Sequence, residues 1–293
     1  MRIVVGFKVA PDFEALREAD WARVAAAEGP QGRAEAVRFV RRVIGVFDEA
    51  ALELALRLRD ARAERGLQTR LAAFTVGGRE AGPFLTTLQA LGFACARVGP
   101  AGPAAPAGGH ADGAAAPDGA LDFAPAATAA LVAACAQRLG GDVLLLGERG
   151  SPGGSGTVPF LAAEALGRPC VSGVTEVEPA GGDRLRVTFT DDDGPLRGVV
   201  APPCVLAVGN AVVSTLRVPT LKERLAVRDA AVDELTAADL GVDRASAPAG
   251  TPVLAGLETI DRGRAGIVVP GETPEELARA LYEDHLRARL ERL

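Results

Sequence analysis

Short apolar runs and helical patterns alternate along the first half of the chain. Runs rich in β-branched residues or leucine, from Ile3 to Val9, Leu71 to Val76 and Phe93 to Val98, predict buried strands. Between them, apolar residues spaced three or four apart predict helices from Asp48 to about Arg65 and from Glu80 to Leu91. Such alternation is typical of an α/β protein with a mainly parallel sheet and helices on both faces.

The second half begins with the same pattern and then changes. A helix is predicted from about Ala124 to Leu139, followed by a buried strand from Asp142 to Gly147, a glycine-rich turn and a helix from Val158 to Leu166. Beyond Pro169, apolar and polar residues alternate singly, which predicts antiparallel strands joined by tight turns. These strands cover Val171 to Val177, Leu185 to Thr190 and Leu196 to Val200, and a last buried strand covers Cys204 to Val208. We therefore expect an antiparallel meander at one edge of the sheet.

The C-terminal part is expected to leave the core from about Asn210 as an extended arm. It ends in an amphipathic helix from Pro274 to Leu290, with Thr273 as a suitable N-cap. We interpret residues 1–209 as a nucleotide-binding α/β domain. Residues 210–293 are interpreted as an arm and a helix that dock on another subunit.

Composition narrows the class of protein. With 293 residues and 48% hydrophobic content, the chain can bury a sizeable core. The net charge of -6 and the lack of a basic stripe argue against nucleic acid as a partner. No apolar run is long enough to span a membrane and no secretory signal is found, so we expect a cytoplasmic protein without direct membrane insertion. Residues 99–119 are almost entirely Ala, Gly and Pro, which predicts a flexible insertion.

Side chains suited to metal or covalent chemistry are scarce. The four cysteines stand far apart without a CxxC spacing, and the two histidines lie elsewhere in the sequence. We therefore expect neither a metal site nor a disulfide framework. No Ser-His-Asp set, carboxylate pair or Cys-His pair can be assembled, so no catalytic residues are predicted.

The glycine-rich segment Gly147-Glu-Arg-Gly-Ser-Pro-Gly-Gly-Ser-Gly-Thr157 carries most of the candidate chemistry. Glycines permit positive φ, so consecutive backbone N–H groups can converge on a phosphate. Ser155 and Thr157 add hydroxyl donors, and the following helix adds the positive end of its dipole. The segment lacks the GK[ST] of a P-loop and the spacing of the dinucleotide fingerprint. We interpret it as a phosphate cradle, with an ordinary flexible loop as the alternative.

Three weaker candidates accompany this segment. Asp48, in Gly45-Val-Phe-Asp48, is a plausible helix N-cap, and its place at a helix start also allows contact with an adenine or a ribose. Gly6 lies within a strand, where glycine indicates either close approach of a ligand or a packing accommodation. Leu221 and Lys222, on the arm, are candidates for anchoring a partner protein, with a surface turn as the alternative.

Five segments, in order, resemble the β-subunit of electron transfer flavoproteins. Val4-Val-Gly-Phe-Lys-Val-Ala-Pro-Asp12 is similar to that family's first strand, and Phe47-Asp-Glu-Ala-Ala-Leu-Glu-Leu-Ala-Leu-Arg-Leu58 resembles its N-P-[FY]-[DC]-E-x-A-[LV]-E-x-A-x-R-L signature. The strand from Asp142 and its loop are similar, without a gap, to D-L-[VI]-L-x-G-x-Q-x-x-D-x-D-x-x-Q-[VT]-G. Leu216-Arg-Val-Pro-Thr-Leu-Lys222 and Leu235-Thr-Ala-Ala-Asp-Leu-Gly-Val242 resemble R-[YF]-P-[ST]-L-[KP] and L-x-x-x-D-L-G-V.

The resemblance implies an adenine-nucleotide α-hydrolase-like fold, AMP as a structural ligand, and an α-subunit partner with which the chain helps to hold FAD. The heterodimer would be an electron carrier, not an enzyme. It would take electrons from flavin dehydrogenases, typically the acyl-CoA dehydrogenases of fatty acid oxidation, and pass them to a quinone oxidoreductase.

The same resemblance implies which positions hold the nucleotide. Carried over by position, they are Gly6, Gly45, Val46, Phe47, Asp48, Val76, Gly147, Arg149, Gly153, Gly154, Ser155, Gly156, Thr157 and Val158. Leu221 and Lys222 match the loop that recognises dehydrogenase partners.

The chain departs from the family pattern within the loop itself. Arg149, Pro152, Gly154, Thr157 and Pro159 stand where the family has Gln, Asp, Asp, Gln and Gly. Backbone N–H groups can bind a phosphate without those carboxylates, and an arginine can assist them. Four alternatives stay open for the site: AMP, a second FAD as in bifurcating subunits, ATP in a stand-alone stress-type protein of the same superfamily, or no nucleotide.

Overall fold

The computed structural model describes residues 1–27, 32, 36–99, 121, 123–242, 263 and 266–292. The chain divides into two compact units, Met1–Leu257 and Glu258–Leu293. Apart from Gly99, the insertion predicted over residues 99–119 lies outside the described residues. Within the described ranges, no helix is both long and apolar enough to cross a membrane.

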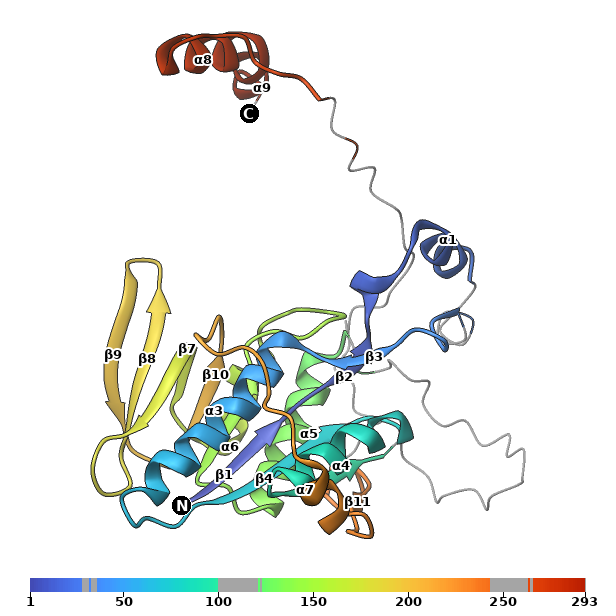
Figure 1. Cartoon of the computed structure of the whole chain (residues 1–293), viewed down its shortest axis with the longest axis vertical. Helices are drawn as coiled ribbons and strands as arrows, with labels where there is room; N and C mark the ends of the chain where they lie inside the picture. The colour runs from blue at the N-terminus through green and yellow to red at the C-terminus, as the bar shows by residue number, and fades with distance from the viewer. Residues whose placement is uncertain are drawn as a thin grey trace. The chain divides into compact units, whose positions relative to one another are not determined.

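A nine-stranded sheet forms the centre of the first unit in the described part of the chain (Figure 1). Its strand order is β11-β5-β4-β1-β6-β10-β7-β8-β9, parallel as far as β7 and antiparallel for β8 and β9. The strands are β1 (Arg2–Gly6), β4 (Arg70–Val76), β5 (Phe93–Val98), β6 (Val143–Gly147), β7 (Cys170–Pro179), β8 (Leu185–Asp191), β9 (Gly194–Val200), β10 (Cys204–Val208) and β11 (Asp233–Leu235). The predicted parallel sheet with an antiparallel edge meander is confirmed.

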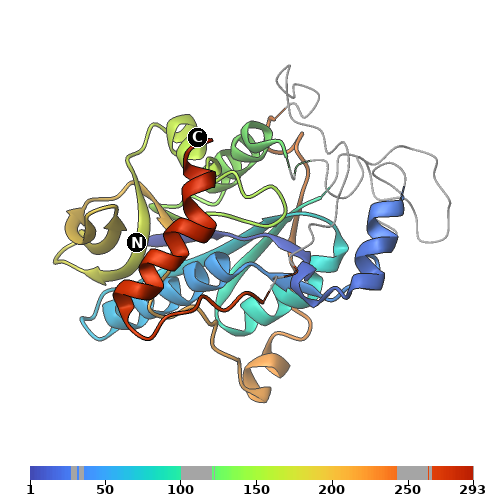
Figure 2. The same ribbon diagram turned by 90° about the horizontal axis from the view of Figure 1, so that it is seen from above.

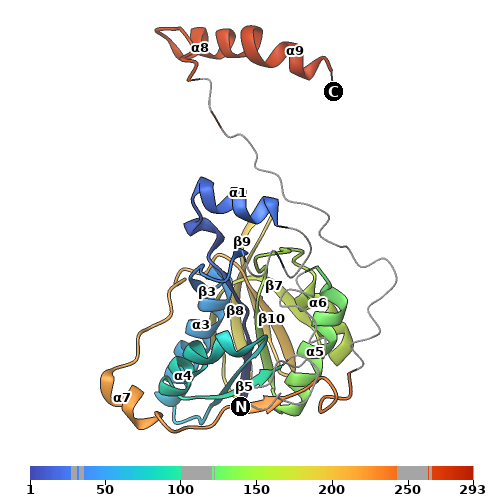
Figure 3. The ribbon, with the colours of Figure 1, turned by 90° about the vertical axis from the view of Figure 1, so that its right-hand side faces the viewer.

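Helices cover both faces of this sheet, as predicted (Figure 3). On one side lie α3 (Val46–Ala63) and α4 (Gly82–Ala90), and on the other α5 (Pro125–Arg138) and α6 (Val158–Leu166). Successive strand residues point to opposite faces, so Ile3 and Val5 pack with α3 while Val4 packs with α5. All three are fully buried, which explains why these strands are continuous apolar runs without alternation.

The first predicted strand is shorter than expected. It ends at Gly6, and Val9–Pro11 (β2) turns away to pair antiparallel with Arg42–Ile44 (β3) in a separate two-stranded sheet. The backbone N–H of Lys8 donates to a side chain instead of continuing the strand ladder. The prediction of one strand from Ile3 to Val9 was therefore wrong in its second half.

The arm after residue 209 returns to the sheet, contrary to the expectation that it leaves the core. Its strand β11 adds a parallel edge next to β5, where Arg97 forms an ion pair with Glu234 at 2.6 Å. Between β10 and β11 lies α7 (Leu221–Ala226), which packs beside α4 and projects outward (Figure 2). A strand of three residues is too short to produce a readable hydrophobic pattern, so the sequence could not predict β11.

The remaining described elements are short or lie near the two ends of the chain. The N-terminal ones are η1 (Phe13–Ala15) and α1 (Glu18–Ala26), and η2 (Arg79–Ala81) precedes α4. The second unit contains α8 (Pro274–Leu281), the π-helical turn η3 (Tyr282–Leu286) and α9 (Arg287–Leu290). Thr273 is the N-cap of α8, because its hydroxyl accepts the N–H of Glu276 at 3.3 Å. That capping prediction is confirmed.

Candidate functional site

The direction in which strands are added to the sheet reverses between β1 and β6. The chain continues from β1 toward β4 and β5 on one side, and from β6 toward β7 and β10 on the other. In open α/β sheets ligands bind beyond the carboxyl ends of the strands at such a switch point, because diverging connections leave a crevice there. Residues 45–48 begin α3, and residues 147–158 lead from β6 into α6. We refer to these two segments together with Lys8 as the switch-point site.

Asp48 joins the ends of the two central strands. One carboxylate oxygen, Oδ2, accepts the backbone N–H of Lys8 at 2.9 Å, and the other, Oδ1, accepts the N–H of Gly147 at 3.1 Å. The residue is 6% exposed, and this burial raises the pKa of Asp48 to about 7, although both N–H bonds and the charge of Lys8 act to lower it. Asp48 therefore holds the backbone after β1 and the end of β6 in fixed positions at the switch-point site.

The prediction that Asp48 caps α3 was wrong. The N-cap is Gly45, and the helix begins at Val46, so Asp48 lies in the first turn. Its carboxylate is used by the strand ends instead of by the helix. A capping pattern and a tertiary contact require the same residue type, and the sequence alone does not separate them.

Two glycines of the predicted site are required by close packing. A Cβ on Gly147 would overlap Oδ1 of Asp48, so only glycine allows the carboxylate to reach the strand end. A Cβ on Gly6 would lie 2.6 Å from Cδ2 of Leu146 and 3.0 Å from Cζ of Phe74. The space above Gly6 is thus filled by side chains of the protein's own core, which agrees with the packing alternative for this residue.

The loop after β6 has the backbone freedom that an anion cradle needs. Gly153, Gly154 and Gly156 have φ values of 98°, 53° and 68°, in the region that favours glycine. The hydroxyls of Ser155 and Thr157 lie 3.1 Å apart, and Thr157, the N-cap of α6, makes no side-chain capping bond. The first N–H groups of a helix have no acceptor within the helix. At α6 these are the N–H groups of Val158 and Phe160, since Pro159 has none, and they can bind an anion at the loop.

Lys8 lies on the β1 side of the switch point, and sequence reasoning did not select it. Its backbone N–H binds Asp48, and its side chain crosses to the loop, where Nζ donates to the carbonyl oxygen of Pro152 at 3.1 Å. The residue is half-buried. The available signal was its position two residues beyond the first buried strand.

The other predicted nucleotide residues lie around the same edge of the sheet. Val46 is 63% exposed and Phe47 is half-buried, both in the first turn of α3. Val76 is the last residue of β4, next to β1 in the sheet, while Arg149 is exposed on the loop. Beside Val76, the hydroxyl of Thr75 is buried without a hydrogen-bond partner among the described residues. A glycine cradle, free helix donors, a lysine and an unpartnered hydroxyl fit a phosphorylated, polar ligand.

The predicted partner-binding residues form a separate surface on α7. Leu221 and Lys222 begin this helix, and Leu221 is 73% exposed. Val218 and Leu225 are also exposed apolar residues, at 79% and 61%. The structure therefore does not bring Leu221 and Lys222 to the switch-point site.

An ion-pair network anchors the arm that carries α7. Arg217 donates from Nη2 and Nε to the carboxylate of Glu53, at 2.8 and 3.1 Å, and from Nη1 to Asp60 at 2.7 Å. Its backbone N–H also donates to Glu53, at 3.1 Å. Both carboxylates belong to α3, whose first turn holds Asp48. We call Arg217, Glu53 and Asp60 the arm clamp.

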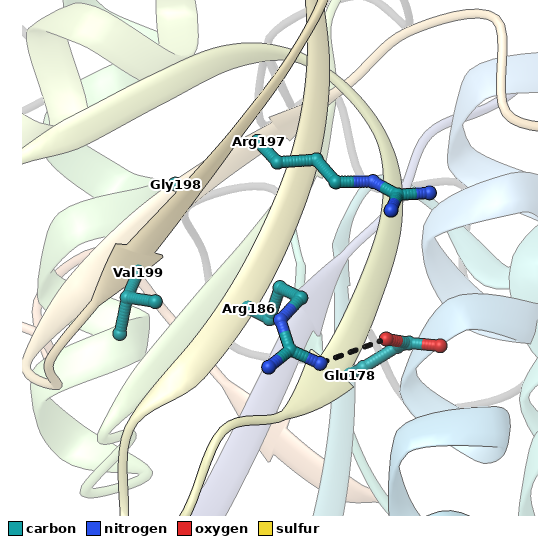
Figure 4. A pocket seen from close by; sticks show the side chains of 5 residues that line it. All are labelled: Glu178, Arg186, Arg197, Gly198 and Val199. Atoms are coloured by element: carbon teal, nitrogen blue, oxygen red, sulfur yellow. Dashed lines mark ion pairs between the residues drawn. The ribbon is translucent and has the colours of Figure 1, made fainter.

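A shallow cavity of about 320 Å³ lies on the edge meander, away from the predicted site residues (Figure 4). It is lined by Glu178, Arg186, Arg197, Gly198 and Val199, and Arg186 pairs with Glu178 at 3.6 Å.

In the part of the chain that the structure describes, no three His, Cys, Asp or Glu residues are grouped to hold a metal ion.

Comparison with known proteins identifies the family of the chain. The chain matches the electron transfer flavoprotein domain over residues 38–240, a span that includes both loop segments of the switch-point site and α7. It is also 30% identical, over 293 residues, to the Escherichia coli (strain K12) protein named "Putative electron transfer flavoprotein subunit YgcR". That alignment covers 99% of this chain and 100% of the relative. The chain belongs to the electron transfer flavoprotein family.

Proposed function

We propose that the chain is the β-subunit of a heterodimeric electron transfer flavoprotein and that the switch-point site holds AMP as a structural ligand. The observation that carries this proposal is the site itself. Asp48 draws the ends of β1 and β6 together under a glycine-rich loop that leads into the N-terminus of α6. Such a crevice suits a nucleotide, and the residues around it form no catalytic set.

Each part of the site has a role in this proposal. The phosphate is bound by the hydroxyls of Ser155 and Thr157 and by loop N–H groups between residues 153 and 158. The N–H of Gly154 is not one of them, because it donates to the carbonyl oxygen of Gly150. Residues 45–48 and Val76 contact the adenosine. Gly147 keeps the carboxylate of Asp48 in place, and Arg149 adds positive charge at the open side of the loop. The ligand is then held where it links two strands and two helices, which is a structural use of a nucleotide.

The chain is proposed to act as an electron carrier subunit without catalytic residues of its own. It helps to hold the FAD of an α-subunit, and that flavin supplies the electron chemistry when it is bound. The cytoplasmic heterodimer takes electrons from acyl-CoA or other flavin dehydrogenases and delivers them to a quinone-linked acceptor. Leu221 and Lys222 on α7 form the dehydrogenase-binding surface, which the high exposure of the apolar α7 residues supports.

The arm and the second unit are proposed to dock on the α-subunit. Helix α8 and the turns after it carry the apolar residues Leu277, Leu281, Tyr282, Leu286 and Leu290, each of them between 39% and 54% exposed. Most of these residues are four apart, and residues with that spacing lie on one face of a helix. An apolar face of this kind is buried in a stable assembly, and the proposed α-subunit supplies the covering surface.

Mass spectrometry of the nucleotides released from the purified native complex tests the proposal. AMP and FAD in equal amounts, with a second flavoprotein chain co-purifying, is the expected result. Two FAD molecules per complex would instead assign a second flavin to the switch-point site. A stable homodimer that contains ATP, or no nucleotide in any preparation, would overturn the proposal.

A further inference from the structure

We propose that Lys8 is a phosphate-binding residue of the switch-point site and that it recognises the phosphate of a nucleoside monophosphate. This inference rests on the proposed nucleotide site, which it extends by one residue and by the charge that residue provides. Three observations carry it: the position of Lys8 in the sheet, its contact with the loop, and the charge around it.

The position of Lys8 in the sheet is the first observation. Lys8 follows β1, the strand on one side of the switch point, and the loop follows β6 on the other side. Its backbone N–H is bound by Asp48, which also binds the end of β6. The main chain of Lys8 therefore has a fixed position relative to the loop. A side chain that starts from a hydrogen-bonded backbone loses less freedom when it binds a ligand.

The contact with the loop places the ammonium group beside the cradle. Nζ of Lys8 donates to the carbonyl oxygen of Pro152, next in sequence to Gly153 and three residues before Ser155. An ammonium presents three N–H donors on a flexible stem. One ammonium can therefore bind several acceptors at once, and a phosphate oxygen above the loop can be one of them beside the carbonyl of Pro152.

An anion at this position needs a nearby cation because Asp48 is close by. Asp48 and Lys8 interact electrostatically, and the carboxylate of Asp48 is already hydrogen-bonded to two backbone N–H groups. A phosphate placed near Asp48 without a cation would face the carboxylate's negative charge in a partly buried crevice. The ammonium of Lys8 offsets part of that repulsion. Its half-buried position strengthens that compensation, because solvent screens it less than it screens an exposed side chain such as Arg149.

Binding of two probes to the complex, after its own nucleotide has been removed, distinguishes a phosphate contact from a merely structural lysine. AMP and adenosine differ only by the phosphate, so loss of a phosphate contact changes the ratio of their dissociation constants. For Lys8→Met we expect AMP to bind at least about tenfold more weakly while adenosine binding changes less than about twofold. Lys8→Arg should recover most of the loss. Arg197→Met, which removes a cation from the edge meander, should bind both probes as the wild type does.

The sequence offers a second test that needs no variant. Lys8 and Lys222 are the only lysines in the chain. An amine-reactive reagent followed by peptide mass spectrometry therefore compares one lysine at the site with one on α7. We expect AMP to slow modification of Lys8 by about tenfold or more, adenosine to have a smaller effect, and neither to change Lys222.

The outcomes separate this inference from the proposed function. An unchanged AMP-to-adenosine ratio in Lys8→Met, or equal protection of Lys8 by the two probes, would overturn the role of Lys8 and leave the nucleotide site standing. A wild-type complex that binds no AMP would overturn both. If Lys8→Met does not fold, the wild-type labelling experiment still decides.

Discussion

The arm clamp gives the sharpest stability prediction. Glu53 is 3% exposed and accepts bonds from Nε, Nη2 and the backbone N–H of Arg217, with Arg57 as a further partner at 3.3 Å. Burial alone raises the pKa of Glu53, but the bonds from Arg217 outweigh it, so the pKa lies below its ordinary value. Replacing Arg217 by Met removes the guanidinium and leaves a buried carboxylate with a half-exposed arginine as its main charged partner.

We expect Arg217→Met to lower the free energy of unfolding by about 2 to 3 kcal/mol. Breaking a fully buried ion pair costs roughly 3 to 5 kcal/mol, and the estimate is reduced because the side chain of Arg217 is itself 36% exposed. Glu53→Gln, which removes the buried charge but keeps the shape, should cost about 1 to 2 kcal/mol. In the double variant no unpaired buried charge is left, so its loss should be smaller than the sum of the two by about 1 kcal/mol or more.

Urea unfolding followed by circular dichroism at pH 7.5 measures these differences, with the slope against urea compared among variants. The control is Arg186→Met, because Arg186 also pairs with a glutamate, Glu178, but both side chains are at least half exposed. That change should cost no more than about 0.5 kcal/mol. The pKa of Glu53 is 4.5 in the unfolded chain and lower in the folded protein. Its contribution to the free energy of unfolding should therefore be present above pH 4.5 and be lost as the pH falls through the lower, folded pKa.

Two results would refute this reasoning. A loss in Arg217→Met that is no larger than the loss in Arg186→Met would mean that the clamp is not held in solution. Additive losses in the double variant would mean that Arg217 and Glu53 act independently.

Three further predictions concern the switch-point site and the thiols. Gly147→Ala should lower the free energy of unfolding by about 1 to 3 kcal/mol because its Cβ would overlap Asp48, whereas Gly82→Ala, with open space around it, should be neutral or stabilising in urea titrations. The folded pKa of Asp48, about 7, is above its unfolded value of 3.8, so its contribution to stability is present below 3.8 and is lost as the pH rises to about 7. Asp48→Asn should remove that slope, at most about 1.4 kcal/mol per pH unit, and a wild-type-like slope in this variant would assign it to another group. Burial raises the pKa of the Cys95 thiol to about 12 and that of the half-buried Cys170 thiol to about 11. A thiol reagent at pH 8 should therefore label Cys170 before Cys95. Faster labelling of Cys95 would contradict the burial of β5.

The parts of the fold that depend on local pattern could be predicted from the sequence. Strands β5 and β10 and helix α6 begin and end at the predicted residues, because each is a strongly apolar segment with turn residues at its ends. The glycine-rich loop was also found in this way, since positive φ values restrict the residue type.

The parts that depend on distant contacts could not be predicted. Glu53 and Arg217 are 164 residues apart in sequence, and nothing in either segment indicates the other. Asp48 has the appearance of a helix cap until the strand ends are placed beside it. The apolar pattern places Lys8 within a predicted strand, and nothing in it indicates that the side chain crosses to the loop. In each case the residue type was visible, and its partner was not.

The antiparallel meander ends in β9, the last strand of the sheet order in the described part of the chain. A sheet edge exposes backbone groups that can pair with a strand of another molecule. Leu196 and Val199 add exposed apolar surface to this edge, at 44% and 58% exposure, which favours such pairing. Pro195 removes one N–H donor from the edge, and the exposed Arg197 adds a charge next to Leu196 in the strand. A proline and a charge on an edge strand oppose edge-to-edge pairing, so these two residues protect the chain against aggregation.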